Sequence, residues 1–289
     1  MKLLLTGADG FTGLHFTNMA VDAGYDVISL QSDLLDSIAV KKEVLDVQPD
    51  LVVHLAAISF VAYGDAEAIY KVNIVGTRNL LSALSLLDKT PKAVLLASSA
   101  NVYGNASFEV LDESTPVSPA NDYGVSKAAM EQLAQLWMDS LPIIIARPFN
   151  YTGEGQDPKF LIPKIVGHFV RKESVIELGN IDVERDFSDV RVVCSVYQKL
   201  LETSDAVGKT FNICSGVTHS LKDIISIMER IAGYKIEVKV NPEFVRPNEI
   251  KRLVGDNSYL HDVIGNQIYP EIEQTLRWMY SSALNVNLS

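Results

Sequence analysis

Cysteine is scarce in this chain and long hydrophobic runs are missing, which limits the compartments that suit it. The two cysteines among its 289 residues, Cys194 and Cys214, belong to no Cys-x2-Cys or Cys/His cluster. Isolated thiols predict buried free cysteines in a reducing cytosol, so we expect a cytoplasmic protein. No apolar run reaches the ~18 residues of a membrane span, and the first residues lack the features of a signal peptide. We therefore expect no membrane contact.

Positive charge is also in short supply. The chain has 25 lysines and arginines against 36 aspartates and glutamates, a formal net charge of −11. This balance argues against a nucleic-acid partner. The five histidines are scattered, without the spacing of a metal site. With 47% apolar residues, the composition suits one or two globular domains with a sizeable core.

A strand, a glycine turn and a helix follow one another at the start of the chain. Residues 2–5 are apolar, Gly7, Gly10 and Gly13 come next, and an amphipathic stretch covers 14–23. Gly7 permits a tight turn, Gly10 lets the backbone approach a ligand, and Gly13 allows close helix–strand packing. The positive end of the helix would then face a pyrophosphate. The order predicts a dinucleotide-binding unit, although the spacing is Gly-x2-Gly-x2-Gly.

Short apolar strands alternate with helical patterns through the first half of the chain. The predicted strands are 2–5, 26–30, 51–55, 93–98 and 142–146. This alternation predicts an α/β fold, a doubly wound parallel Rossmann sheet with helices on both faces. The segment 30–36 after the second strand leaves no room for the helix of a full second βαβ unit.

The end of the second predicted strand carries Gln31 instead of an acidic residue. A carboxylate there normally binds the ribose 2′-hydroxyl of NAD. Its absence removes the repulsion that would exclude a 2′-phosphate, although no arginine stands nearby to select one. We expect NADP or NAD as cofactor, with NADP favoured.

Prolines and glycines interrupt the helical patterns from residue 157 onwards. We expect a smaller α/β substrate-binding domain built from two excursions. Residues 187–193 and 210–215 would return to the main sheet between them. The predicted division gives 1–158 and about 186–216 to the Rossmann domain, and about 159–185 and 217–282 to the smaller domain.

Tyr123 and Lys127 stand four residues apart, and Ser99 lies upstream at the end of an apolar strand. Residues at i and i+4 are neighbours on one helix face. An ammonium beside a phenol lowers its pKa from ~10 towards neutrality, which suits proton transfer to an alcohol or ketone. Alone, such a pair also fits any long solvated helix.

Five ordered motifs extend this pattern over nearly the whole chain. They are Thr6-Gly7-x2-Gly10-Phe11-x-Gly13, His54-Leu55-Ala56-Ala57, Ser98-Ser99-Ala100-Asn101-Val102-Tyr103-Gly104, Tyr123-x3-Lys127 and Arg147-Pro148-Phe149-Asn150. Together they resemble the extended short-chain dehydrogenase/reductase family, the NAD-dependent epimerases and dehydratases that modify nucleotide sugars.

The resemblance implies a role for each matching residue. Tyr123 would transfer the proton, Lys127 would bind the nicotinamide ribose and lower the tyrosine pKa, and Ser99 would hydrogen-bond the reacting oxygen. Two positioned donors would stabilise the negative charge that hydride transfer builds on that oxygen. The implied cofactor-binding residues are Gly7, Gly10, Phe11, Thr12, Gly13, Asp33, Leu34, Leu55, Ala56, Ala57, Tyr123, Lys127 and Pro148.

Three nearby polar residues have plain structural interpretations. Ser98 suits a strand-end hydrogen bond as well as catalysis. His54 fits a buried packing residue, and Asn73 fits a residue that fixes backbone.

Two absences restrict the reaction. Family members that dehydrate a hexose across C4–C6 carry acidic residues where this chain has Ala100 and Asn101, because they need general acid and base carboxylates. Members that epimerise C3 and C5 use a cysteine near the serine position, and residues 97–99 contain none. Carbonyl reduction at C4 or C4 epimerisation remains.

Segments of the second half resemble family members that reduce GDP-4-keto-6-deoxymannose. By this resemblance Lys164 borders guanine, Arg185 and Arg246 pair with pyrophosphate or ribose oxygens, and Glu249 holds a ribose hydroxyl. Arg185 could instead form a surface ion pair with its acidic neighbours, and Arg246 could be structural. The implied substrate-binding set is Ser99, Asn101, Asn150, Lys164, Arg185, Arg246 and Glu249.

We therefore expect NAD(P)H-dependent reduction of a GDP-4-keto-6-deoxyhexose, giving GDP-D-rhamnose or its C4 epimer GDP-6-deoxytalose. A C4 epimerase with tightly held NAD stays open. A non-catalytic dinucleotide sensor is disfavoured because both tyrosine and lysine are retained. The family also implies a homodimer, which the sequence shows only as apolar helix residues such as Met130, Leu133 and Leu136.

Overall fold

Six parallel strands form the central sheet. The structure is a computed structural model that describes residues 1–59, 64–106, 109–244 and 251–286. The sheet order is β2-β1-β3-β4-β5-β9, and every neighbouring pair is parallel. The first five strands lie within two residues of their predicted positions. They and the sixth are β1 (Lys2–Thr6), β2 (Asp26–Ser29), β3 (Leu51–His54), β4 (Ala93–Ala97), β5 (Ile143–Pro148) and β9 (Thr210–Ile213).

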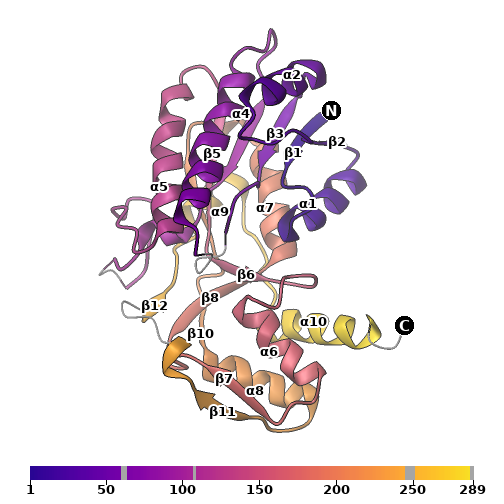
Figure 1. Cartoon of the computed structure of the whole chain (residues 1–289), viewed down its shortest axis with the longest axis vertical. Helices are drawn as coiled ribbons and strands as arrows, with labels where there is room; N and C mark the ends of the chain where they lie inside the picture. Colours follow the sequence, from indigo (N-terminus) through magenta and orange to yellow (C-terminus); the bar gives the residue numbers. More distant parts are fainter. Residues whose placement is uncertain (60–63, 107–108, 245–250, 287–289) are drawn as a thin grey trace.

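Helices cover both faces of this sheet, as predicted for a doubly wound fold (Figure 1). Leu3 and Leu5 of β1 point into one buried core and Leu4 into the other, because successive strand residues face opposite sides. Helices α1 and α7 cover the first core, and α2, α4 and α5 cover the second. Their bounds are α1 (Phe11–Asp22), α2 (Ser37–Val47), α4 (Thr77–Leu84), α5 (Asp122–Ala134) and α7 (Val190–Glu202).

Helix α2 corrects one prediction, because the connection between β2 and β3 does contain a full helix. Asp36 caps its first turn by accepting hydrogen bonds from the backbone N–H groups of Ile38 and Ala39, at 3.1 and 3.0 Å. Val40 and Val44, four residues apart, are fully buried under the sheet. The segment 30–36 is thus only the turn that precedes the helix.

Residues 187–193 also differ from expectation, since they do not return to the main sheet. Strand β8 (Glu184–Asp189) pairs instead with β6 (Asn150–Thr152), β10 (Thr218–Ser220) and β12 (Arg252–Leu253). The chain then enters α7, whose buried residues recur at helical spacing. Asp189 caps this helix by accepting from the Arg191 N–H at 2.8 Å. The predicted return at 210–215 is correct, as β9.

The remaining second half forms a smaller layered part, at the bottom of Figure 1. Strands β7 (Val175–Leu178) and β11 (Glu237–Val240) pair in parallel, and α6 (Leu161–Val170), α8 (Leu221–Ala232) and α10 (Ile272–Val286) surround a separate buried core. The predicted domain boundaries stay a prediction.

No helix within the described ranges has the length and apolarity to cross a membrane. The shorter elements are α3 (Ala66–Tyr70), the π-helix η1 (Lys71–Gly76), η2 (Ala100–Tyr103), η3 (Gln135–Trp137), η4 (Ser204–Ala206), η5 (Pro242–Phe244) and α9 (Ser258–Ile264).

The strand order reverses at β1, which has β2 on one side and β3 on the other. In doubly wound sheets, ligands bind at the carboxyl ends of the strands beside such a reversal. The glycine turn follows β1, Leu55 to Ala57 follow β3, and Ser99 follows β4. The topology therefore brings these predicted site segments to one edge.

Candidate active site

The glycine turn packs so closely that side chains are excluded. Gly7 has φ +70°, and a Cβ at Gly13 would lie 2.0 Å from the Gly7 carbonyl oxygen. Helix α1 begins immediately after Gly10, and no side chain caps it. Its N-terminal N–H groups can therefore face an anion, as a pyrophosphate site requires. The geometry agrees with the turn and packing roles predicted for these glycines.

Two predicted cofactor residues, Phe11 and Thr12, contact a tyrosine that the sequence reasoning missed. The Thr12 and Tyr151 hydroxyls share a hydrogen bond of 2.9 Å. The Phe11 ring stacks on Tyr151 with centroids 6.1 Å apart. Tyr151 directly follows the Arg147–Asn150 motif, and this position in the sequence could have indicated that it lies at the site.

His54 is part of a buried hydrogen-bond chain beneath the β3 end. The Ala56 N–H donates to the Thr6 hydroxyl at 3.1 Å, which lies 2.7 Å from His54 Nδ1. His54 Nε2 lies 2.8 Å from the Thr77 hydroxyl, which donates to the Asn73 carbonyl. Burial, aided by the charge of Lys127, lowers the His54 pKa to about 3. A neutral imidazole with hydrogen on Nε2 satisfies every link, which confirms a packing role for His54.

Asn73 fixes backbone, as predicted. Its side chain accepts from the Ile58 N–H at 2.9 Å and donates to the Ile58 carbonyl at 3.1 Å. It also donates to the Ser126 hydroxyl, which donates to the Tyr123 carbonyl at 2.7 Å. These bonds tie the loop after β3 to the first turn of α5.

Tyr123 and Lys127 are both buried on α5, with 8% and 3% of their surfaces exposed. The Lys127 amine donates to the Ala97 carbonyl at 2.7 Å and lies 5.9 Å from the Tyr123 ring centroid. Gly124 lets α5 approach the serine segment, because a Cβ there would lie 2.6 Å from the Asn101 carbonyl oxygen. The structure thus brings the predicted tyrosine, lysine and serine segments together.

The pKa of the Tyr123 phenol differs from the sequence prediction. Burial raises it, the neighbouring Tyr151 raises it further, and a hydrogen bond with Ser99 acts in the opposite direction. Burial also lowers the Lys127 pKa to about 8, opposed by the charge of Glu131. In the protein chain by itself, desolvation therefore outweighs the expected effect of the ammonium on the phenol.

The two serines after β4 have different environments. Ser99 is buried, and its hydroxyl accepts from the backbone and side-chain N–H groups of Asn101 at 3.2 and 3.1 Å. The Ser98 hydroxyl donates to Glu131 at 2.5 Å. Ser98 is therefore engaged in a buried strand-end bond, whereas Ser99 is the serine that contacts Tyr123.

A buried ion pair, also missed from the sequence, lies beside this site. Arg147 donates to both carboxylate oxygens of Glu131, at 2.9 and 2.6 Å, and to the Tyr103 hydroxyl at 2.9 Å. Tyr103 in turn donates to Asn212 at 2.6 Å. The network joins α5, β5, β9 and the segment after β4. Glu131 is also one helical turn from Lys127, whose charge it stabilises.

Four other residues predicted to bind the cofactor or the substrate have separate environments. Asp33 accepts from the Leu35 N–H at 2.9 Å, and the carbonyl of buried Leu34 accepts from Asn79 at 2.8 Å. Pro148 is buried at the end of β5. The Asn150 Nδ2 is buried and has no hydrogen-bond partner within the described part of the chain. Such an orphaned donor fits a ligand contact.

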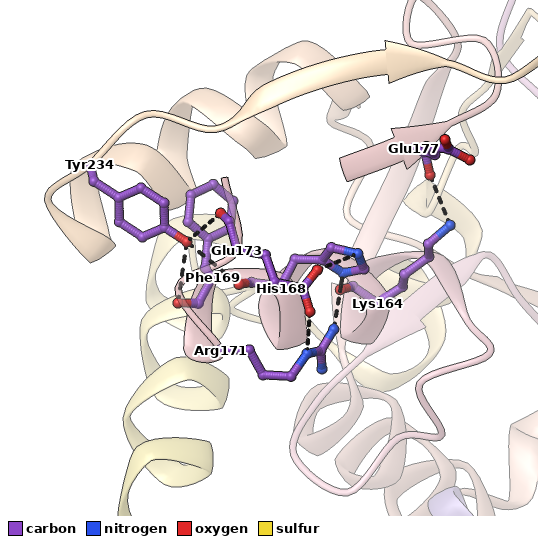
Figure 2. Close-up of polar contacts among 7 residues, drawn as sticks. All are labelled: Lys164, His168, Phe169, Arg171, Glu173, Glu177 and Tyr234. Atoms are coloured by element: carbon purple, nitrogen blue, oxygen red, sulfur yellow. Dashed lines mark hydrogen bonds and ion pairs between the residues drawn. The ribbon is translucent and has the colours of Figure 1, made fainter. Parts of the chain in front are cut away.

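Lys164 lies on α6 in the smaller part of the protein, and Arg185 lies on β8. The Lys164 amine donates to the Glu177 carbonyl at 2.8 Å (Figure 2) and lies 4.5 Å from the Phe244 ring centroid. Arg185 donates to the Glu184 carbonyl at 2.8 Å. Arg246 and Glu249, which were also predicted to bind the nucleotide, lie outside the described residues.

Three features define the class of this protein. The strand order of the sheet reverses at β1, an uncapped helix follows a glycine turn, and a serine, a tyrosine and a lysine are buried at the same edge. Together they define an NAD(P)-dependent oxidoreductase of the extended short-chain type. The residues fit the cofactor, because the cradle at Gly7 and Gly13 excludes any Cβ. The chain belongs to the GDP-mannose 4,6 dehydratase family, which residues 28–279 match.

Two relatives match this chain along nearly their whole length. GDP-6-deoxy-D-talose 4-dehydrogenase from Aggregatibacter actinomycetemcomitans is 34% identical over 290 residues, covering 98% of both proteins. GDP-6-deoxy-D-mannose reductase from Pseudomonas aeruginosa is 33% identical over 305 residues, covering 97% of this chain and 96% of that protein.

Two solved structures match as completely. RMD from Pseudomonas aeruginosa, complexed with NADPH, has a TM-score of 0.89 at 31% identity and covers 99% of both chains. A Burkholderia cenocepacia J2315 protein, provisionally described as an epimerase, has a TM-score of 0.94 at 48% identity over 98% of both chains. These likenesses confirm the predicted family and fold.

Proposed function

We propose that this enzyme reduces the C4 ketone of a GDP-linked 4-keto-6-deoxyhexose with NADH or NADPH. The observation that carries the proposal is the buried group of Ser99, Tyr123 and Lys127 at the carboxyl edge of the sheet. The names of the two relatives support a GDP-sugar with a carbonyl or hydroxyl at C4. The product is GDP-D-rhamnose or its C4 epimer GDP-6-deoxytalose.

The site residues divide the chemistry between them. When bound, the reduced nicotinamide supplies a hydride to the C4 carbon. Tyr123 donates its phenolic proton to the C4 oxygen, and Ser99 hydrogen-bonds the same oxygen as negative charge develops there. Lys127 holds a positive charge beneath them and can bind the hydroxyls of the nicotinamide ribose.

The raised pKa of Tyr123 agrees with a role as proton donor. A proton donor must be protonated before the step, and burial keeps the phenol protonated at neutral pH. Proton transfer remains favourable because an alkoxide is more basic than a phenolate.

The nucleotide sugar would lie between the catalytic edge and the smaller part. Asn101 and the unpartnered Asn150 amide suit contacts to the sugar or its phosphate. Lys164 would exchange its hydrogen bond to the Glu177 carbonyl for a contact at the guanine. We retain the predicted roles of Arg185, Arg246 and Glu249 at the diphosphate and ribose as part of this proposal.

The test uses purified enzyme, reduced cofactor and GDP-4-keto-6-deoxymannose, with cofactor oxidation followed at 340 nm and the product identified by NMR. Tyr123→Phe should lower kcat by about 10²–10⁴-fold while the Kd for cofactor, measured by fluorescence, stays within about threefold. Absence of oxidation by the wild-type enzyme would reject this substrate. Unchanged turnover in Tyr123→Phe would reject the proton donor.

A 4-epimerase is the second candidate, because the Burkholderia cenocepacia protein at 48% identity is provisionally described as an epimerase. It would use the same serine, tyrosine and lysine with tightly held NAD. It predicts NAD in the purified protein and sugar interconversion without net consumption of cofactor. Stoichiometric oxidation of added NADH or NADPH distinguishes the reductase from it.

A homodimer remains a prediction. Of the helix residues proposed from the sequence, Met130 is fully buried in the core, whereas Leu136 is 75% exposed. Val75 on η1 and Val125 on α5 are also exposed. Sedimentation of the wild-type protein would decide its oligomeric state.

A further inference from the structure

A carboxylate lies at the end of β2, although the sequence of the strand end has none, and it belongs to helix α2. Glu43, on α2, accepts hydrogen bonds from the backbone N–H groups of Gln31 and Ser32, both at 2.8 Å. Its second contact with Ser32 is the hydroxyl, which donates at 2.5 Å. The residue twelve positions after Gln31 thus supplies the charge that the strand end lacks in sequence.

The position of Glu43 is set by how α2 packs. Val40 and Val44 are buried against the sheet, and Asp36 fixes the start of the helix. Glu43 lies between these anchors and turns towards the adjacent strand end. Strand β2 is the edge strand of the sheet and ends at Ser29. Gln31 and Ser32 lie just beyond it, and their three donors converge on the Glu43 carboxylate.

The end of the second strand is the place where a Rossmann protein meets the ribose 2′ position of its dinucleotide. A 2′-phosphate needs N–H or hydroxyl donors and positive charge there. In this protein the donors are already bound to a carboxylate. A 2′-hydroxyl, in contrast, can donate a hydrogen bond to that carboxylate.

The surrounding charges do not neutralise Glu43. Within the described ranges it has no ion-pair partner, and its hydrogen bonds with Ser32 and Gln31 lower its pKa despite the opposing effect of burial. The cations nearest in sequence, Lys41 and Lys42, line a groove that α2 forms with Arg78 of α4. Asp33 and Asp36 in the preceding turn add negative charge.

We propose that Glu43 makes this enzyme select NAD(H) against NADP(H), by occupying the donors at the end of β2 and by repelling a 2′-phosphate. The inference rests on the proposed use of a nicotinamide dinucleotide, but it does not depend on the sugar substrate. This proposal reverses the preference for NADP that Gln31 predicts, because the packing of α2 places the Glu43 carboxylate where the strand itself has none.

The experiment measures Kd for NADH and NADPH by fluorescence titration of the purified protein without sugar. Wild type should bind NADH at least about tenfold more tightly than NADPH, a difference of about 1.4 kcal/mol. Glu43→Gln keeps the shape of the side chain and removes its charge, so it should lower the ratio of the NADPH Kd to the NADH Kd by about tenfold. Asp46→Asn, an equal change of charge at an exposed position of the same helix, should leave the ratio unchanged.

Ser32→Ala provides a second variant that keeps the charge and loses one hydrogen bond, and it should retain the preference for NADH. Wild-type protein that binds NADPH as tightly as NADH overturns the inference, whatever the stability of the variants. So does a ratio in Glu43→Gln that equals the wild-type ratio. If neither cofactor binds, the proposed oxidoreductase function fails as well. If NADH binds selectively but no ketosugar is reduced, only the substrate assignment fails.

Discussion

The buried amine of Lys127 should make the protein less stable at neutral pH than at alkaline pH, and a variant without this amine should lose that difference. The amine is almost fully buried, and its pKa falls from 10.5 to about 8. A cation with a lowered folded-state pKa binds fewer protons than the same group in the unfolded chain. Wild-type stability should therefore rise between about pH 8 and pH 10.5, and the full penalty of the buried charge applies below pH 8.

The magnitude follows from the size of the pKa change. A difference of roughly 2.5 units at 1.36 kcal/mol per unit corresponds to about 3 kcal/mol. Lys127→Met removes this titration but leaves the Ala97 carbonyl without its donor, which costs about 1–3 kcal/mol at every pH. The difference between wild type and variant isolates the lysine, because the other titrating groups are common to both.

The assay is urea denaturation of wild type and Lys127→Met at several values between pH 7 and 10.5. Across this range the free energy of unfolding of wild type should rise by about 3 kcal/mol more than that of the variant. Lys41→Met, a substitution of an exposed lysine on α2, controls for the loss of one positive charge. Parallel curves for wild type and Lys127→Met would refute the account of a buried ammonium.

Two further substitutions test the site. Gly13→Ala should weaken binding of both dinucleotides by at least about tenfold in a fluorescence titration, because its Cβ would meet the Gly7 carbonyl at 2.0 Å and cost about 1–3 kcal/mol; wild-type affinity would contradict the close packing of the turn. Arg147→Met should destabilise the fold by about 3–5 kcal/mol, since Glu131 would be left charged and unpaired. The double variant Glu131→Gln/Arg147→Met should recover part of that loss in the same urea assay, and strictly additive losses would show that the two side chains do not act as a pair.

Local patterns predicted most of the Rossmann sheet. The strands are short apolar runs between turn residues, and Gly7 and Gly13 mark positions where the backbone leaves no space for a side chain. The path of 184–202 was harder to predict, because the phenylalanine and three valines of residues 187–193 favour a strand by local propensity. Its first part pairs with small strands and its second part is helical.

The predicted catalytic residues come together, but spacing could not predict their electrostatics. An i, i+4 pair shows that an ammonium and a phenol are neighbours, whereas the depth at which α5 is buried depends on the whole fold. That burial reverses the expected direction of the Tyr123 pKa. Glu43 illustrates the same limit, since it reaches the end of β2 only through the packing of α2.

Transfer of deuterium from cofactor to sugar tests the central proposal most directly. The enzyme is incubated with GDP-4-keto-6-deoxymannose and NADH carrying deuterium in the transferred position, and the product is analysed by NMR and mass spectrometry. Reduction at C4 predicts one deuterium on that carbon and one NADH oxidised per sugar. A product without deuterium at C4, or a sugar converted with no NADH consumed, would contradict the account.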